Sequence, residues 1–492
     1  MSVPSEYIQQ LVAHYLKEHG LNTTLASFEA ELNKKFSNIS IDESIETIVK
    51  DRVNFQKLSL ADDASNVNTT DSIIQSEYVK GKCIDIQKWN VQYPQSSELL
   101  DLDIENPLII YSTFWSAVFK DKCYNLGLFV TNSKYVILFD FDVNKILAKI
   151  FDPLNGQPIK IVSGINGTNN VFICDMNGNL LSFKLSLVDG VFTLNRNCKE
   201  GLKLHRRLIT DFKFILDKKD KRLGYFASIG WDGRVLIGSV FNSDELLDFK
   251  IINDYKLMTN PTVIHLTLDK ATQTPILIVG RLNSTLLSVF VLNGNIKDCK
   301  MVELCRVSLN DSEFSNHSFQ PMSILELNSK TSNTILTIAT DHVPYMRLIT
   351  IMIPPIEEIL NDNSNFPNVE NNAPSTVLQK LSHIAQTQNS EQSFHSNVPV
   401  LRQLIISNFN SISPQDKYSS AILLARPNSS GLWIPGDDGK IRGFDLHTGA
   451  LMETLDSNDG RAKTAFSACS VNGEIMVICG ALDRKIVVWK IK

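Results

Sequence analysis

The chain has 492 residues, of which 48 are basic and 53 acidic, giving a formal net charge of −5, with 43% apolar and 21% charged residues. These values are close to globular averages and exclude a wholly disordered or fibrous chain, while the length predicts several domains or a repeat architecture. No apolar run approaches the ~20 residues of a membrane span, the first residues (MSVPSEYIQQ) lack the regions of a secretory signal, and the acidic balance argues against a nucleic-acid partner.

The first 36 residues carry the pattern of a helical hairpin. Five apolar residues recur at steps of three and four and share one helical face: Ile8, Leu11, Val12, Tyr15 and Leu16. Gly20 is expected to end this helix, and Asn22 or Thr23 to cap a second one. The second helix has its own apolar stripe: Leu25, Phe28 and Leu32. A unit of about 30 residues is too small to bury these stripes alone, so the pattern predicts association with a partner.

The spacing of Tyr15-Leu16, Gly20-Leu21, Thr24-Leu25, Phe28 and Glu31 resembles the LisH motif, a short two-helix dimerisation module. The resemblance lies within residues 1–36 and implies that the apolar stripes form the contact of a homodimer or homotetramer. Leu25 departs from the family's pattern, in which a small alanine is common. The alternative is a hairpin that packs onto the rest of its own chain.

After a polar and acidic linker over residues 37–75, with a helix as an option, the sequence from 76 to 492 alternates β-rich runs with turn signals. The clearest runs surround Asp232-Gly233, Asp438-Gly439 and Asp483, because Asp-Gly pairs favour tight hairpins. Seven such runs end near residues 139, 183, 237, 290, 348, 444 and 489, at spacings of 44, 54, 53, 58, 96 and 45. The longest spacing contains a polar insertion at 361–400.

A repeat of this length with paired hairpins predicts a propeller blade of four strands. The predicted fold is therefore mainly β, a seven-bladed propeller over residues 76–492 with a small N-terminal helical hairpin, and eight blades are the alternative. An early run at 81–89 is expected to complete the last blade, which would close the ring without a free sheet edge.

The repeats resemble degenerate WD40 repeats. In one blade, His205 and Asp211 followed by Trp231-Asp232 are similar to that family's internal His/Asp geometry, although the last repeat has Trp489-Lys490 where the family has Trp-Asp. The resemblance implies structural roles for the residues at blade turns and strand ends: His205, Asp211, Trp231, Asp232, Asp438, Asp483 and Trp489. LisH–WD40 proteins act as dimeric or tetrameric scaffolds, which implies co-regulator complexes, ubiquitin ligases and motor-regulatory complexes as settings.

Motifs of catalysis are absent from the sequence. It contains no phosphate-binding glycine loop, no nucleophile elbow and no zinc-binding HExxH helix, and its nine histidines are scattered. We therefore assign no catalytic, cofactor-binding or metal-binding residue and expect a protein that is not an enzyme. The eight cysteines form no C-x-x-C pair and are expected as reduced, mostly buried thiols in the nucleus or cytoplasm.

Two segments leave alternatives open. The basic run at 218–222 suits a solvated hairpin tip, a nuclear-import signal or a phosphate contact. Within the insertion, Val377, Leu378, Leu381 and Ile384 form a short amphipathic pattern that either docks on the side of the propeller or folds on a partner.

The sequence thus predicts a non-catalytic scaffold that self-associates through its hairpin and presents a propeller to protein partners in a multisubunit complex. One alternative is a ubiquitin-ligase substrate receptor, for which Phe444-Asp445-Leu446-His447 is the nearest match to the Trp-Asp-x-Arg of such receptors. A propeller that binds a small ligand in its channel, or RNA, is the other.

Overall fold

The computed structural model describes residues 5–36, 45, 79, 84–90, 92–189, 191–198, 200–217, 222–243, 246–293, 300–310, 319–362, 377, 379–381, 384, 398–457, 460–471 and 473–491. The chain divides into two compact units. One consists of Met1–Asn68 with Asn310–His317, and the other of Thr69–Leu309 with Ser318–Lys492.

The described part of the first unit is the predicted helical hairpin, formed by α1 (Ser5–Glu18) and α2 (Asn22–Leu32). Gly20 adopts a φ of +68° between them, the left-handed conformation expected at a helix end. The expectation that Asn22 or Thr23 caps α2 is wrong, because Leu21 is the N-cap residue and no side chain caps the helix. The backbone makes this turn instead, with the Leu25 N–H donating to the Leu21 carbonyl at 2.9 Å.

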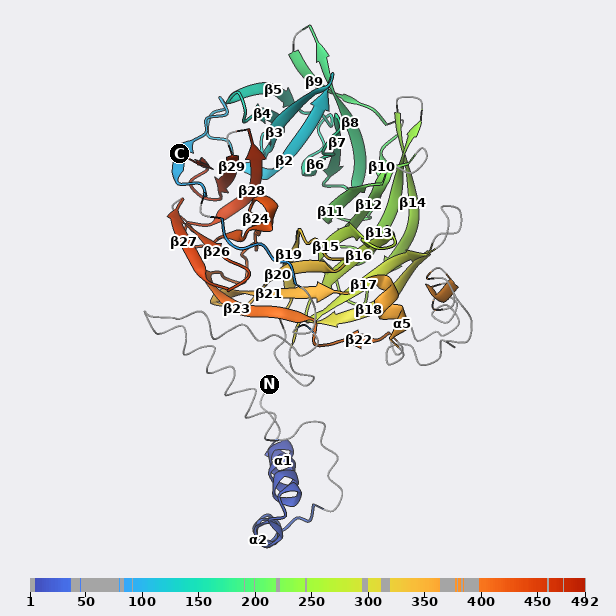
Figure 1. Cartoon of the computed structure of the whole chain (residues 1–492), viewed down its shortest axis with the longest axis vertical. Helices are drawn as coiled ribbons and strands as arrows, with labels where there is room; N and C mark the ends of the chain where they lie inside the picture. The colour runs from blue at the N-terminus through green and yellow to red at the C-terminus, as the bar shows by residue number, and fades with distance from the viewer. Residues whose placement is uncertain are drawn as a thin grey trace. The chain divides into compact units, whose positions relative to one another are not determined.

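The second unit is a ring of seven β-sheets, which are the blades of a β-propeller (Figure 1). Blade 1 contains β2 (Ile109–Phe119), β3 (Lys122–Thr131), β4 (Tyr135–Asp140) and β5 (Lys145–Phe151). Blade 2 contains β6 (Ile159–Gly164), β7 (Asn170–Asp175), β8 (Asn179–Val188), β9 (Val191–Arg196) and β10 (Leu202–Lys203). Blade 3 contains β11 (Ile209–Leu216), β12 (Arg222–Gly230), β13 (Arg234–Ser243) and β14 (Leu246–Lys256). In blade 2, β9 and β10 both pair with β8.

The remaining four blades follow the same antiparallel order around the ring. Blade 4 contains β15 (Pro261–Leu268), β16 (Pro275–Arg281), β17 (Leu286–Asn293), β18 (Lys300–Ser308) and β22 (Val400–Leu401). Blade 5 contains β19 (Pro321–Leu327), β20 (Thr334–Thr340), β21 (Tyr345–Ile353) and β23 (Ile405–Pro414). Blade 6 contains β24 (Leu424–Ala425), β25 (Leu432–Pro435), β26 (Lys440–Phe444) and β27 (Leu451–Asp456). Blade 7 contains β28 (Ala462–Ser470), β29 (Gly473–Gly480), β30 (Ile486–Lys490) and β1 (Ser96–Leu99). A short 3-10 helix, Pro427–Ser429, links β24 to β25.

The seven-bladed prediction is confirmed, and the reason lies in which strand carries the repeat signal. Each of the seven sequence positions used for the count falls in the third strand of a different blade, from Phe139 in β4 to Trp489 in β30. The third strand of each blade is a strand-forming run that follows a turn, and in blades 2, 3 and 6 this turn carries an Asn-Gly or Asp-Gly pair. Buried apolar side chains then form seven clusters, each between two neighbouring blades.

The ring closes by a strand from the start of the unit, as expected, but the strand is not the run at 81–89. That placement is wrong: residues 84–89 form no strand, and β1 pairs with β30 from Ser96↔Lys490 to Leu99↔Val487. The apolar residues of the earlier run are used for packing, since Ile86 is buried between blades 5 and 6. The strand that closes the ring has the sequence Ser-Ser-Glu-Leu and lies at an exposed edge. It therefore lacks the apolar pattern by which a strand is predicted from sequence.

A buried ion pair holds the segment that leads into the closing strand. The guanidinium of Arg426 donates to the Glu474 carboxylate (3.0 Å from Nη2 to Oε2) and to the backbone carbonyls of Asn90 (2.9 Å) and Gln92 (2.7 Å). It also lies 3.9 Å from the centre of the Trp89 ring. Both charged side chains are 1% exposed. We call this arrangement the Arg426 clamp.

The polar insertion leaves the propeller within blade 5, between β21 and β23. It follows α5 (Ile356–Asn361), and its residues Leu381 and Ile384 are buried in the cluster between blades 4 and 5. Its end, β22, pairs in parallel with β18 and adds a fifth strand to blade 4. The docking alternative is therefore confirmed for the described residues of the insertion, while Leu378 lies outside them.

Candidate interaction surfaces

Most of the predicted contact stripe of the hairpin is only half-buried. Leu11 and Leu16 are buried, with exposed fractions of 7% and 9%, whereas Val12 and Tyr15 are only half-buried. On α2 none of the described residues is buried, and the half-buried set is Leu25, Phe28 and Leu32. The Phe28 ring stacks on Phe36 with centroids 6.1 Å apart. Ile8 lies in α1, but its side chain is outside the described set.

The propeller has one face on which its turns follow a common rule. In each blade, a backbone N–H just after the second strand donates to a carbonyl in the connection that leads into the blade, at 2.8–3.2 Å. The seven donor–acceptor pairs are Asn132–Leu108, Met176–Pro158, Trp231–Leu208, Leu282–Asn260, Asp341–Gln320, Asp437–Pro414 and Ala481–Arg461. These turns and connections therefore share one face, which we call the turn face.

Large apolar side chains project from the turn face in most blades. The exposed residues in its turns and connections are Met176, Trp231, Met258, Leu282, Val343, Tyr418 and Leu482, with exposed fractions from 39% to 82%. Exposed apolar side chains that share one face of a protein can contact a partner there. The turn face is therefore the candidate interaction surface of the propeller.

The predicted His/Asp geometry is present in blade 3. His205 Nδ1 lies 2.9 Å from Asp232 Oδ1, and its Nε2 lies 2.9 Å from the Ser228 hydroxyl. Burial lowers the pKa of His205 despite the hydrogen bond to Asp232, so the neutral ring donates to the carboxylate and accepts from the hydroxyl. Burial alone would raise the pKa of Asp232, but hydrogen bonds from His205 and the Arg206 N–H outweigh it and lower the pKa.

The other predicted residues of this blade have separate surroundings. Asp211 does not join the His205 network: its Oδ2 accepts the Ile264 N–H of the next blade at 3.2 Å, which ties blade 3 to blade 4. Trp231 is 58% exposed and points into solvent on the turn face. Its neighbour Asp232 is thus the buried structural residue of the pair, while Trp231 is available for contact.

The predicted residues in blades 6 and 7 lie at turns and in the core. Asp438 forms an ion pair with Arg442 (2.6 Å), and its pKa is lowered, because the bond from Arg442 outweighs burial. Asp483 accepts the Lys485 N–H at 3.2 Å within a turn. Trp489 is 6% exposed and packs between blades 6 and 7. None of these three residues joins the blade 3 network.

A basic pocket of about 320 Å³ adjoins Trp231 on the turn face. Its lining residues are Arg206, Arg207, Trp231, Asp232, Arg234, Lys256 and Asn260. Four of them are cationic and one is the carboxylate that His205 already engages. Arg206 and Arg207 adjoin His205 in the sequence, whereas Trp231 and Lys256 come from later segments of the chain. Residues 218–221 lie outside the described residues.

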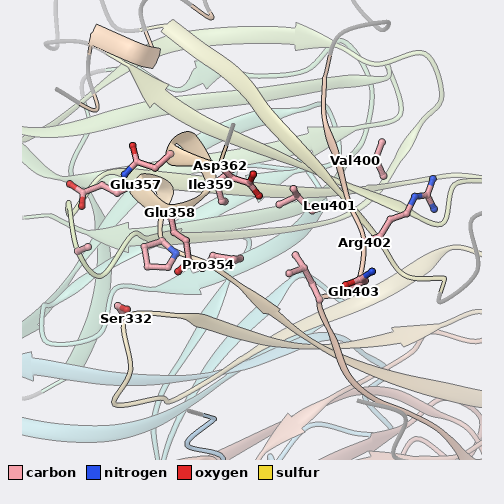
Figure 2. Close-up of a pocket in the computed structure, with 14 residues that line it drawn as sticks. Ser332, Pro354, Glu357, Glu358, Ile359, Asp362, Val400, Leu401, Arg402 and Gln403 are labelled. Carbon is pink, nitrogen blue, oxygen red and sulfur yellow. The ribbon is translucent and has the colours of Figure 1, made fainter. Parts of the chain in front are cut away.

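A larger groove of about 860 Å³ lies where the insertion leaves and rejoins the propeller. Figure 2 shows Glu357, Glu358 and Asp362 on the α5 side and Arg402 on the strand side. Its floor is apolar, formed by buried residues such as Pro354 and Ile359. The acidic side chains and Arg402 lie on opposite sides of its rim. The groove is therefore the boundary between the insertion and the propeller.

The residues considered for other functions are used internally. The Asp445 carboxylate accepts the N–H of His447 (2.7 Å) and of Trp89 (3.4 Å), and Leu446 is buried, so this motif stabilises its own turn. Among the described residues, no three His, Cys, Asp or Glu side chains gather as metal ligands would. No helix within the same residues has the length and apolar character to cross a membrane.

Comparison with known proteins places the propeller in a family. The family described as "UCP007778, beta-propeller domain" matches residues 67–490. A Saccharomyces cerevisiae (strain ATCC 204508 / S288c) protein named "Uncharacterized protein YGR117C" is 24% identical over 481 residues, which cover 90% of this chain and 88% of that protein.

Two solved structures show limited similarity to this chain at low sequence identity. Saccharomyces cerevisiae Sqt1 is 10% identical, with a TM-score of 0.44 over 74% of this chain and 80% of that one. The computationally designed Ika8 protein is 14% identical, with a TM-score of 0.42 over 80% of this chain and 100% of that one.

Proposed function

The chain belongs to the UCP007778 beta-propeller domain family, and from this membership we propose that it is a non-catalytic scaffold. In this proposal the N-terminal hairpin joins two or more copies of the chain, and each propeller presents its turn face to partner proteins. In this proposal the hairpin is a LisH module and the blades are WD40 repeats. It also places the protein in the nucleus or cytoplasm as part of a multisubunit complex.

The observation that carries self-association is the unfilled apolar stripe of α2. Leu25, Phe28 and Leu32 lie on one face of this helix, yet none of its described residues is buried. Burying a Leu or Phe side chain contributes about 1.5–3 kcal/mol relative to exposure, so a second copy that covers these three residues gains enough to associate. An α2 stripe that stayed exposed would leave the hairpin marginal, because short helices gain most of their stability from packing.

The propeller supports the scaffold proposal by the number of surfaces that it offers. Seven blades repeat the same turn geometry, and the turn face carries exposed apolar residues in blades 2, 3, 4, 5 and 7 and in the connections between blades. In blade 3 the ring of His205 is engaged by Asp232 and Ser228, so this buried network holds a turn and has a structural role. A binding role therefore accounts for more of these features than a reaction does.

Native capture tests the scaffold proposal. The full chain is isolated from its own cells under mild conditions, as wild type and as the Phe28→Ala/Leu32→Ala variant, and co-purifying proteins are quantified by mass spectrometry. We expect a fixed set of partners with the wild type, and loss from the variant of those that require self-association. Ala26→Ser, at an exposed position of α2, is the matched control. Isolation of the chain with no stoichiometric partner would overturn the proposal.

A further inference from the structure

Three exposed apolar residues and three unpaired cations form one continuous surface on the turn face of blades 3 and 4. We call it the basic arc: Arg206, Arg207, Trp231, Lys256, Met258 and Leu282. Its continuity follows from backbone hydrogen bonds, because Leu257 N–H donates to Gly233 (2.9 Å) and Leu282 N–H to Asn260 (2.8 Å). The loop that carries Met258 is thus fixed between the turn of Trp231 and the turn of Leu282.

The charge of the basic arc is not balanced locally. Arg234 pairs with Asp254, and both oxygens of Asp232 accept hydrogen bonds from blade 3 itself. The side chains of Arg206, Arg207 and Lys256 have no ion-pair partner among the described residues, and all three are exposed. Elsewhere on the turn face the arrangement differs, since Arg461 is held by Asp416 (2.6 Å) and Asp437 (3.0 Å). A local positive surface therefore stands on a chain whose net charge is −5.

The apolar residues of the arc are as exposed as its charges. Trp231 is 58% and Met258 73% exposed, and Leu282 is 39% exposed. Trp and Arg are the residue types most enriched among those that dominate binding energy at protein interfaces. Met258 and Leu282 have aliphatic surfaces that a phosphate backbone cannot cover, whereas a Leu or Phe side chain of a protein can. The mixture therefore favours a protein ligand over a nucleic acid.

We propose that the basic arc binds an acidic segment of a partner protein, with a large apolar side chain of that segment packed against Trp231 and Met258. Its carboxylates pair with Arg206, Arg207 and Lys256 around the pocket of about 320 Å³. Complementary charge brings the segment to the surface and fixes its orientation, and the apolar contact supplies affinity. This inference rests on the proposed scaffold function, because it names the class of partner that the propeller recruits.

Selection from a random peptide library displayed on phage tests the inference on the immobilised full chain. We expect enriched peptides to combine several Asp or Glu residues with at least one Leu, Ile, Phe or Trp. Binding of the enriched peptides is then measured by fluorescence anisotropy. Trp231→Ser and the charge reversal Arg206→Glu/Arg207→Glu should each weaken it about thirtyfold, as loss of a dominant interface residue does.

Two control variants separate the arc from the rest of the propeller surface. Val471→Ser removes an apolar residue that is 82% exposed in the turn between β28 and β29, and Lys417→Glu reverses an exposed charge in a connection outside the arc. Both should bind the peptides as the wild type does. The inference is overturned if no acidic peptides are enriched, or if the arc variants bind them unchanged.

A second arm uses labelled oligouridylate as the probe for single-stranded RNA. Binding of this RNA with a steep salt dependence, abolished by the arc variants while no acidic peptide is selected, would assign the arc to nucleic acid and overturn the inference. The peptide assay does not need self-association, so its failure is distinguishable from failure of the scaffold proposal. A chain that self-associates but selects no acidic peptide refutes only the arc.

Discussion

Replacing Arg426 by methionine tests how the propeller ring is held closed. The substitution keeps an unbranched apolar side chain but removes the guanidinium that bonds Glu474 and the carbonyls of Asn90 and Gln92. Glu474 then remains 1% exposed with only the Trp433 indole N–H as a partner, at 2.9 Å. Removing one member of a buried ion pair costs about 3–5 kcal/mol, because the other charge stays desolvated without compensation.

The expected shift in melting temperature follows from the size of the unit. A propeller of roughly 420 residues has an unfolding entropy of about 0.9 kcal/mol/K at ~2.1 cal/mol/K per residue, so this loss lowers Tm by about 3–6 °C. Differential scanning calorimetry of the wild type and the Arg426→Met variant measures the shift. Arg442→Met is the control in the same blade, since Arg442 forms a more accessible pair with Asp438, and it should cost less than about 1 kcal/mol.

The double variant Arg426→Met/Glu474→Met isolates the cause. If the unpaired carboxylate is what destabilises the single variant, removing it as well should restore part of the lost stability. An Arg426→Met variant that melts within about 1 °C of the wild type would refute the clamp. So would a double variant whose loss equals the sum of the two single losses, because the two residues would then be uncoupled.

Three further outcomes follow from the described contacts. Burial depresses the pKa of His205, so the unfolded chain takes up more protons than the folded one as the pH falls through about 6.5. The free energy of unfolding should therefore fall from pH 7.5 to 5.5 by more in the wild type than in His205→Gln. Equal losses in urea titrations of the two proteins would contradict this. Leu381→Ala should cost about 2–5 kcal/mol because this residue of the insertion is fully buried, and an unchanged Tm would mean that the docked segment contributes nothing. Thiol labelling followed by peptide mapping should show that the exposed cysteines react quickly and the buried ones only on unfolding. Burial raises the pKa of Cys479 to about 12 and also raises the pKa values of Cys174 and Cys305. Rapid labelling of Cys305 in the folded protein would show that blade 4 opens. The exposed set is Cys123 and Cys469, and the buried set is Cys174, Cys198, Cys305 and Cys479.

The fold could be predicted because its repeat signal is local. Each blade places a strand-forming run next to a turn, and in three blades the turn has a glycine at positive φ, namely Gly178, Gly233 and Gly439. The hairpin was predictable for the same reason, since the stripe spacing and Gly20 lie within a few residues of each other. The cysteine expectation holds for four of the six described thiols, which are buried.

The closing strand and the Arg426 clamp could not be predicted because they depend on partners that are distant in sequence, such as Lys490 for Ser96 and Asn90 for Arg426. β1 has a polar sequence suited to an exposed edge, while the apolar run before it packs through Ile86 instead of pairing. Arg426 gave one signal, an arginine within an apolar run, but its partners Glu474 and Asn90 are distant in sequence.

The candidate surfaces were only partly visible in the sequence for a related reason. The sequence marks Trp231 as a repeat residue, and only the propeller geometry brings it to one pocket with Arg206, Arg207 and Lys256. The helical spacing of Leu25, Phe28 and Leu32 predicts a shared face, but not that all three stay half-buried. Exposure is the property that turns these residues into candidates, and it is set by tertiary structure.

Self-association through the hairpin is the central claim, and the molar mass of the full chain in solution tests it most directly. Light scattering coupled to size-exclusion chromatography should give at least twice the chain mass of 55.2 kDa for the wild type and for Ala26→Ser. The Phe28→Ala/Leu32→Ala variant should elute as a folded monomer. A wild-type chain that remains at 55.2 kDa across micromolar concentrations would contradict the account.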